Sequence, residues 1–190
     1  MPNPQGAHPL PRPRRSAPAK LKLVKWVDAG GCAPPIGVKT TLTSQVESFS
    51  RIAGELPPLF LRHWEELALN RDSIPLDPDW DRMFMLEAQG ILHVTTARAD
   101  GVLVGYIFNI VTRHLHYRSS LFAEIDMFWL DPSYRGTWFW LRWFKDNQRM
   151  LDKLGVKHVH VGIKNHFMAG RVGNIFRRLG YKPVETMWAK

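Results

Sequence analysis

The sequence predicts an α+β fold in which a central mixed, mostly antiparallel sheet of about six to seven strands is flanked by four helices. Two observations lead to this prediction. Short segments rich in β-branched and aromatic residues, typical of strands, alternate with amphipathic segments, typical of helices. Hairpins come first in this order and a connection through a helix comes late. The order therefore implies antiparallel pairing early in the chain and parallel pairing late.

The first strand-like segments precede residue 50. We expect an extended piece over residues 21–27 and a loop rich in Gly and Pro over 30–37. A strand is expected over 40–46, where Thr and Val are frequent.

Two helices are expected next. Pro57 and Pro58 suit the first turn of a helix, where a missing N–H group costs nothing, so an amphipathic helix is predicted over 59–69. Asp79 is a good acceptor for the free N–H groups at the start of a second helix. This helix is predicted to end near Gln89, just before a glycine.

The remaining elements follow a strong hairpin signal. Asp100-Gly101 is typical of a two-residue turn, and it joins strands predicted over 91–97 and 102–111. The elements expected after it are a strand over 121–130, a helix of about 18 residues that begins near Gly136 and stops at Gly155, a strand over 158–163, a helix over 168–179 and a strand over 181–188.

The composition is that of a globular protein. Hydrophobic residues make up 45% of the chain and charged residues 23%, which excludes a disordered or fibrous protein. No apolar run is long enough for a membrane helix, and the N-terminus has no apolar signal-peptide core, so we expect a soluble intracellular protein without membrane contact. The single Cys32 allows no internal disulfide and no cysteine zinc site.

The net charge of +9 is unevenly distributed. Residues 1–25 carry a charge of +6, residues 26–134 carry −6, and residues 135–190 carry +9. This division argues against one uniform basic face. The acidic middle would attract a cationic amine, and the basic last third suits a ligand that carries phosphates.

The N-terminal segment differs in composition from the rest. Six of the fourteen prolines lie within the first 18 residues, which cannot bury enough apolar surface to order themselves. We therefore expect a basic Pro/Arg-rich arm over 1–20 and a single folded domain over 21–190. The arm either docks on a protein or nucleic acid or is a solvated tail without a role.

The most informative segment is IDMFWLDPSYRGTWFWLRWFK, residues 125–145. Its strand runs into Arg135-Gly136 and then directly into a helix. The free N–H groups of the first helical turn would therefore face outward, and the helix dipole would add to their positive potential. Such a helix start is a favourable site for a pyrophosphate.

This segment resembles strand four, the Arg-Gly turn and helix three of the GNAT acyltransferases, and RLGYKPVETMWAK resembles the family's last helix and strand. The resemblance covers about residues 40–190. IPLDPDW, LVGY, HLHYRSS and LGYKPVET are similar to GNAT-like proteins encoded by tailed bacteriophages, which would place the chain in the host cytoplasm or the virion. The resemblance implies a GNAT fold and an acetyl-CoA-dependent N-acetyltransferase that acts on an amine acceptor without a metal.

The resemblance also implies which residues would bind acetyl-CoA. Backbone N–H groups that bulge from the fourth strand would hold the carbonyl oxygen, which maps onto Phe128, Trp129 and Leu130. The other positions implied for the cofactor are Arg135, Gly136, Thr137, Trp138, Phe139, Trp140 and Asn165.

Two positions depart from the family's pattern. Small residues are typical where this chain has Trp138 and Trp140, and indole rings there would crowd a diphosphate unless they point away. Phe176 stands where the family often has a tyrosine that protonates the departing thiolate. A phenyl ring has no proton to donate, so solvent or another residue would have to serve.

Acyl transfer to an amine requires a group that takes the amine's proton. The candidates are Glu124 and Asp126 on the predicted long strand and His114 and His116 just before it. A non-catalytic interpretation is open for Asp126 and for the two histidines. Asp126 would then be a buried acid whose hydrogen bonds are satisfied, and the two histidines would be a loop pair that packs on Tyr117.

The first predicted helix lines the acceptor side in the family. This implies an acceptor role for His63, Trp64 and Glu66, together with Tyr117 from the later loop. The alternative for the helix is a solvated face with one core tryptophan.

Two weaker patterns remain. His114/His116 and His158/His160 each place two imidazoles close together, but no cysteine or fixed carboxylate accompanies them, so no zinc site is expected. The aromatic run 138–144 would stack nucleic-acid bases, fill a core or form a subunit interface.

Three functions stay open on the sequence alone. The first is the acetyl-CoA-dependent N-acetyltransferase. The second is a structural or virion-associated protein on a catalytically degenerate GNAT scaffold, anchored by residues 1–20 or assembled as a homo-oligomer. The third is modification of DNA or of an amine linked to DNA, with the basic arm on the phosphates.

Overall fold

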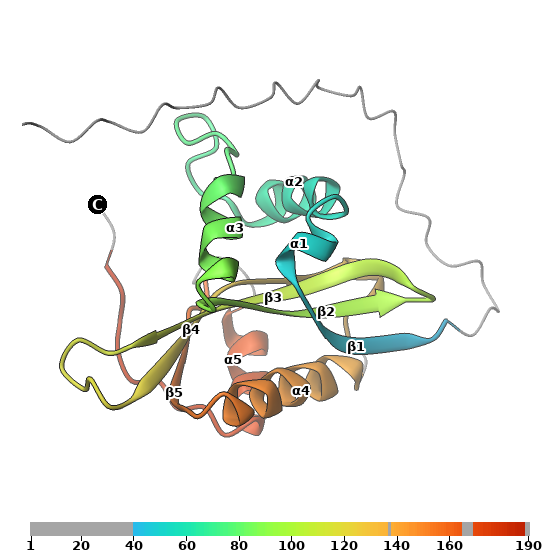
Figure 1. Ribbon diagram of the computed structural model, residues 1–190. Coiled ribbons are helices and arrows are strands. Elements are labelled where there is room, and N and C mark those ends of the chain that lie inside the picture. The colour runs from blue at the N-terminus through green and yellow to red at the C-terminus, as the bar shows by residue number, and fades with distance from the viewer. Residues whose placement is uncertain (1–39, 137, 165–168, 189–190) are drawn as a thin grey trace, which may run out of the picture. The chain divides into compact units, whose positions relative to one another are not determined.

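The computed structural model describes residues 40–136, 138–164 and 169–188 (Figure 1). The predicted arm, the extended piece and the Gly/Pro-rich loop before residue 40 lie outside the described residues. The elements in chain order are β1 (Leu42–Glu47), α1 (Phe49–Ile52), α2 (Leu56–Leu67), α3 (Trp80–Ala88), β2 (Leu92–Ala99), β3 (Val102–Arg113), β4 (Leu121–Leu130), the 3₁₀ turn η1 (Pro132–Tyr134), α4 (Phe139–Lys153), β5 (Val156–Val161) and α5 (Ala169–Arg178).

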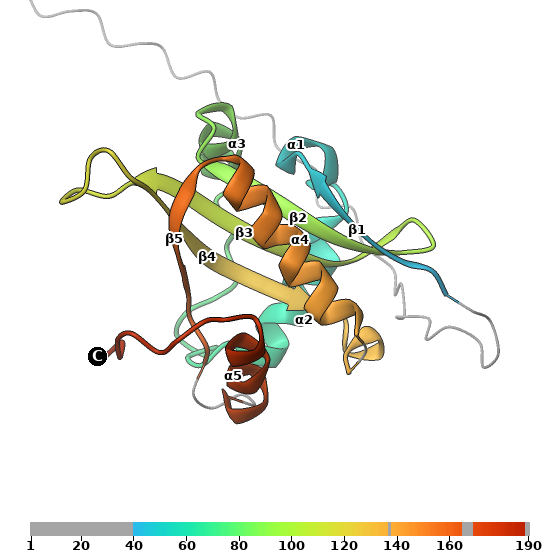
Figure 2. The ribbon, with the colours of Figure 1, turned by 90° about the horizontal axis from the view of Figure 1, so that it is seen from below.

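The five strands form one mixed sheet in the order β1-β2-β3-β4-β5. The first three pairings are antiparallel, and β4 and β5 pair in parallel across the α4 connection. The predicted change from antiparallel to parallel pairing is therefore confirmed. Helices α1, α2 and α3 lie on one face of the sheet, and α4 and α5 lie on the other (Figures 1 and 2).

Each face of the sheet has its own hydrophobic core. The first core packs Phe49, Phe60 and other residues of α1 and α2 against Tyr106 and Trp129 of the sheet. The second packs Trp143 and its neighbours in α4, with Phe176 of α5, against the opposite face. The aromatic run in α4 belongs to this second core, so burial accounts for most of it.

A β-bulge in β4 determines which side chains reach each core. Phe108 of β3 pairs with Met127, and the next residue of β3, Asn109, pairs with Ile125, so Asp126 is an extra residue in β4. Ile125 faces the second core, whereas Met127 lies against the first. The prediction that the bulge falls at residues 128–130 is wrong, because the extra residue is inserted at Asp126.

Local signals place several elements where the sequence predicts them. The Asp79 side chain accepts a hydrogen bond from the Arg82 N–H at 3.0 Å and starts α3. Asp100 and Gly101 have φ angles of 48° and 87°, as a tight hairpin turn between β2 and β3 requires. Helix α2 carries its prolines in the first turn.

Buried polar side chains attach α4 to the sheet. The Asn147 side chain of α4 accepts hydrogen bonds from Thr95 of β2 and Asn109 of β3, both at 2.9 Å. Asn147 also donates to the Asn109 side-chain oxygen at 3.0 Å. Because these amides satisfy one another away from water, α4 has one favoured position along the strands.

Three predictions about the elements are wrong. The helix expected from Gly136 begins at Phe139, because a 3₁₀ turn and an extended Arg135 separate it from β4. The short α1 adds a fifth helix that no capping or periodicity signal indicated. The strand expected over 181–188 does not form, and the extended piece over 21–27 lies outside the described residues, so the sheet of the described residues has five strands. Pro183 lies within that segment and has no N–H group for a strand ladder.

We expect Gly105→Ala to lower the free energy of unfolding by about 1–3 kcal/mol, because a well-packed core resists added atoms. A Cβ at this position of β3 would lie 2.8 Å from both Leu130 Cδ1 and the Trp129 carbonyl oxygen, and 3.1 Å from Trp143 Cη2. Urea denaturation followed by tryptophan fluorescence measures the change. Gly54→Ala is the control, because its Cβ would meet nothing within 4 Å. Equal losses of stability in the two variants would contradict the prediction.

Candidate active site

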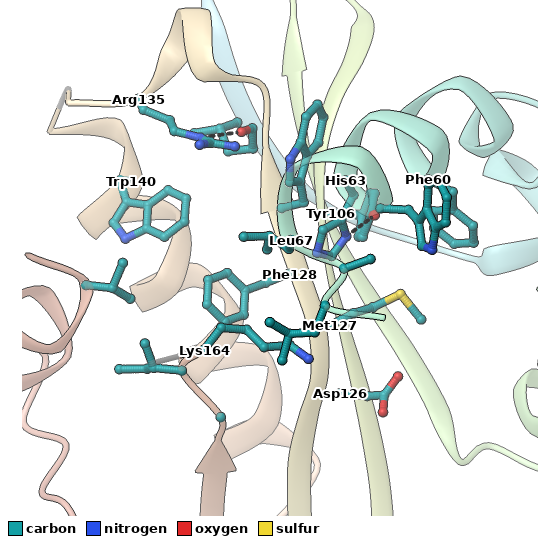
Figure 3. A pocket seen from close by; sticks show the side chains of 18 of the residues that line it. Phe60, His63, Leu67, Tyr106, Asp126, Met127, Phe128, Arg135, Trp140 and Lys164 are labelled. Atoms are coloured by element: carbon teal, nitrogen blue, oxygen red, sulfur yellow. Dashed lines mark hydrogen bonds between the residues drawn. The ribbon is translucent and has the colours of Figure 1, made fainter. Parts of the chain in front are cut away.

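A cavity of about 1210 Å³ opens where β4 leaves β5. Its walls come from α2 and the loop after it on one side and from α5 and residues 162–164 on the other, with β4 between them (Figure 3). The volume exceeds the roughly 1,000 Å³ that a pocket for one small ligand reaches. Two substrates therefore have room in it together.

The floor of the cavity is the free edge of β4. Pairing between β4 and β5 ends at Ile125 and Val161, and all of residues 126–130 line the cavity. Beyond Ile125, in the part of the chain that the structure describes, β4 has no neighbouring strand on its β5 side. Backbone N–H and C=O groups on that side are therefore available to a ligand that carries amides.

The turn that joins β4 to α4 forms one corner of the cavity. The Asp131 side chain accepts hydrogen bonds from the Ser133 N–H at 2.9 Å and from Arg62 at 2.6 Å, and both interactions stabilise this turn. Burial alone would raise the pKa of Asp131, but these hydrogen bonds hold it below its ordinary value. Gly136 has a φ of +83°, which a residue with a side chain rarely adopts.

The two tryptophans after Gly136 take different positions. Trp138 is 82% exposed. Trp140 packs on Phe128 and Phe144, with ring centroids 5.9 and 5.1 Å apart. Both indoles line the cavity, but neither occupies the space around the glycine, since a Cβ added to Gly136 would meet nothing within 4 Å. The crowding of a diphosphate by these indoles stays a prediction.

Glu66 holds the Arg135 side chain. The Arg135 guanidinium donates to both carboxylate oxygens of Glu66, and the Trp129 indole N–H donates to Glu66 Oε2 at 2.7 Å. The Arg135 Nε donates to the Leu130 carbonyl oxygen at 2.7 Å. Burial would raise the pKa of Glu66, but the hydrogen bonds from Arg135 and Trp129 lower it below its ordinary value. Arg135 thereby fixes the turn to α2 and β4.

His63 and Tyr106 form an uncharged pair in the wall of the cavity (Figure 3). His63 Nδ1 lies 2.6 Å from the Tyr106 hydroxyl, and the imidazole stacks on Trp129 at 6.3 Å. Burial, together with the positive charges of Arg135 and Lys164, lowers the pKa of His63 to about 4, although Glu66 acts in the opposite direction. Burial also raises the pKa of the Tyr106 phenol.

Charged side chains are separated along the cavity. Arg171 and Arg178 line it from α5, where a spacing of seven residues places them on one face of the helix. Lys164 lines it just after β5. The carboxylates among the lining residues are Asp126 at the bulge and Asp77 in the loop before α3. The α5 side is therefore cationic, whereas acidic groups lie toward α2 and α3.

The structure brings together many of the residues that the sequence singles out. Glu66 lies in a shallow cleft that adjoins the cavity through Trp129. The predicted residues that line the cavity itself are His63, Trp64, Asp126, Phe128, Trp129, Leu130, Arg135, Gly136, Trp138 and Trp140.

Other predicted residues lie elsewhere. His114, His116 and Tyr117 pack on one another and on Phe122 at the β3–β4 loop, away from the cavity-lining residues. Glu124 is not among the lining residues and is exposed on β4. The remaining predicted residues are Phe139, which is buried in the second core, and Thr137 and Asn165, which lie outside the described residues.

Many lining residues were not indicated by the sequence, and those with the clearest chemistry among them are Tyr106, Lys164, Arg171 and Arg178. The spacing of the two arginines on a strongly amphipathic helix was a usable signal. Tyr106 gave no such signal, because an aromatic residue in a strand is typical of a hydrophobic core. In the described part of the chain, no three His, Cys, Asp or Glu side chains are grouped to hold a metal ion.

We expect the fold to lose stability on acidification through His63. The unfolded chain binds a proton on this histidine below its ordinary pKa of 6.5, but the folded chain does so only near pH 4. The contribution of His63 to the free energy of unfolding is therefore complete above pH 6.5 and is lost as the pH falls from 6.5 to about 4. The fall in Tm between pH 7.5 and 5 should be smaller in His63→Gln than in the unmodified chain or in His116→Gln. Equal falls in all three proteins would exclude this role.

The fold is shared with known acetyltransferases. A similar solved structure is an aminoglycoside acetyltransferase from an uncultured soil metagenomic sample, with a TM-score of 0.65, 11% identity and coverage of 79% of this chain and 97% of that one. Another is a ribosomal-protein-alanine N-acetyltransferase from Brucella melitensis biovar Abortus 2308, with a TM-score of 0.59, 14% identity and coverage of 79% and 98%.

A third similar structure is a predicted acetyltransferase with acetyl-CoA from Clostridium acetobutylicum, with a TM-score of 0.57, 8% identity and coverage of 79% and 96%. No protein-family model and no curated protein sequence matches the chain. At these identities the likeness establishes the fold alone. The chain has the fold of the GNAT acetyltransferases.

Proposed function

We propose that the protein is an acetyl-CoA-dependent N-acetyltransferase that acetylates an amine. The observation that carries this proposal is the parting of β4 and β5 at Asp126, which leaves the edge of β4 open beside the Gly136 turn in a cavity large enough for two substrates. The fold shared with acetyltransferases supports it. Fold does not determine function, so the site must carry the argument.

The residues present fit acetyl-CoA. Lys164, Arg171 and Arg178 would bind its phosphates by charge, together with backbone N–H groups at the start of α4. The open edge of β4 would bind its amides along residues 126–130. Acetyl-CoA supplies an acetyl group activated as a thioester. Exposed backbone N–H groups near the bulge would donate to the carbonyl oxygen as charge develops on it.

Asp126 is the proton acceptor that we assign to the amine. Of the four base candidates from the sequence, it is the one that lines the cavity. It lies at the bulge, next to the open strand edge on which the thioester would bind. His63 is uncharged at neutral pH because its pKa is about 4, so it does not repel an incoming ammonium. A general base must come within hydrogen-bond distance of the reacting nitrogen, and Asp126 lines the cavity in which the amine would bind.

One observation favours the degenerate scaffold as a second candidate. Phe176 is 3% exposed in the second core, packed on Phe128 and Phe144, so no phenol at that position serves the departing thiolate. The phage origin, a virion location, a homo-oligomer, and protein or nucleic-acid contacts of residues 1–20 remain predictions. The aminoglycosides named for one similar structure do not transfer at 11% identity.

Calorimetric titration with acetyl-CoA tests the proposal. We expect micromolar binding that weakens as the ionic strength rises, because cations hold the phosphates. Arg171→Ala combined with Arg178→Ala should weaken the affinity by about tenfold or more, since each charge-assisted hydrogen bond contributes roughly 1.5–3 kcal/mol. Arg177→Ala is the matched control, because it lies on the same helix but does not line the cavity.

Absence of binding at millimolar acetyl-CoA would refute the enzyme and favour the degenerate scaffold. Equal affinities in the double variant and the Arg177→Ala control would refute the assigned phosphate site. Arg135→Ala is unsuitable here, because it also breaks the hydrogen bonds to Glu66 and Leu130 that fix the turn. A measured release of CoA with an amine would then establish the reaction.

A further inference from the structure

We propose that the acceptor is a monoamine on an apolar body, such as an aralkylamine, with its ammonium at Asp126 and its body against α2 and the loop after it. This inference rests on the proposed function and specifies its acceptor. It is carried by the chemistry of the cavity wall on the α2 side, which differs from that of the α5 side.

The α2 side of the cavity is predominantly apolar. Polar groups are sparse there, and the pair formed by His63 and Tyr106 is uncharged and internally hydrogen-bonded. The apolar residues that line this side include Phe60, Leu67, Leu69, Ile74, Leu76 and Met127. Such a wall favours an acceptor that removes apolar surface from water.

Several of these side chains are uncovered. Leu69 is 58% exposed, Ile74 is 61% exposed and Leu76 is 38% exposed, although all three line the cavity. Large aliphatic side chains that remain accessible together at a cavity wall indicate a binding surface for an apolar group. A strongly hydrated acceptor with many hydroxyl or ammonium groups would lose hydration against them without compensation.

Of the two lining carboxylates that the structure describes on this side, only Asp126 lies at the bulge, so one ammonium is held at the reaction site. Asp126 and Asp77 are the lining carboxylates in the described residues, and Glu66 is already engaged by Arg135 and Trp129. The two α5 arginines face the cavity from the opposite side, and the charge of Lys164 reaches His63 on this side, so all three would repel further positive charge.

The position of Asp126 links this wall to the reaction site. Its carboxylate lies on the same side of β4 as Met127, Tyr106 and Phe60, whereas Phe128 lies on the side of α4 (Figure 3). The bulge therefore turns Asp126 toward the apolar wall, directly beside the open strand edge. An ammonium at this carboxylate would be placed next to the thioester, with its apolar body along α2.

The experiment is a calorimetric titration of the full chain, saturated with CoA, which binds the cofactor side without allowing turnover. The probes are 2-phenylethylamine, its uncharged analogue 2-phenylethanol, and spermidine as a polycation. We expect 2-phenylethylamine to bind at least about tenfold more tightly than either of the others, because it alone satisfies both the carboxylate and the apolar wall.

Two variants separate the charge at the site from general electrostatics. Asp126→Asn should weaken the affinity for 2-phenylethylamine about tenfold and leave the affinity for 2-phenylethanol unchanged, since only the amine interacts with the carboxylate. Asp72→Asn removes an equal charge from the loop after α2 but does not line the cavity, and it should change neither affinity. Thermal melts that match the unmodified chain establish that both variants fold.

Tighter binding of spermidine, or an unchanged affinity of Asp126→Asn for 2-phenylethylamine, would overturn the inference. Failure of the proposed function is a different result, because CoA itself would then not bind. The three probes are in that case titrated without CoA. The expected order of affinities would still support a monoamine site at Asp126, and absence of amine binding would refute it.

Discussion

One extra residue in β4 determines the architecture of the whole site. The bulge at Asp126 reverses which side chains of β4 face each core, so that Ile125 and Met127 lie on opposite faces of the sheet. Pairing with β5 ends at the same place. A regular strand would continue the ladder and close the gap, and the free edge that lines the cavity would not exist.

The parting of the strands must be stabilised by other contacts, because an unpaired strand edge lacks the backbone hydrogen bonds on one of its two sides. Side chains of α2, together with Arg135 of the turn after β4, provide this support. Arg62 and Arg135 lie over the Trp129 indole at 5.1 and 5.8 Å, and Glu66 accepts hydrogen bonds from both Trp129 and Arg135. Helix α2 thus fixes the end of β4 and the following turn in place of a strand partner.

Sequence patterns predict the elements better than the site. Asp79, Asp100 and Gly101 act locally, so their capping and turn signals gave the correct element ends. The residue inserted at Asp126 depends on pairing with β3, which no local pattern records. Tyr106 was missed for the same reason. It lies in a strand, and its place in the cavity wall depends on the contact with His63 of α2, which is distant in the sequence. Long-range contacts therefore set the chemistry of the site.

The separation of charge along the cavity gives direction to the proposed reaction. Phosphates would be attracted by Arg171 and Arg178 and repelled by Asp126, and an ammonium would experience the opposite forces. Between these ends Arg135 is paired with Glu66 and His63 is neutral, and Lys164 adds a positive charge whose field reaches His63. A donor with phosphates and a cationic acceptor would each be favoured at one end only. Electrostatics alone would then orient both substrates with their reacting groups toward the open edge of β4.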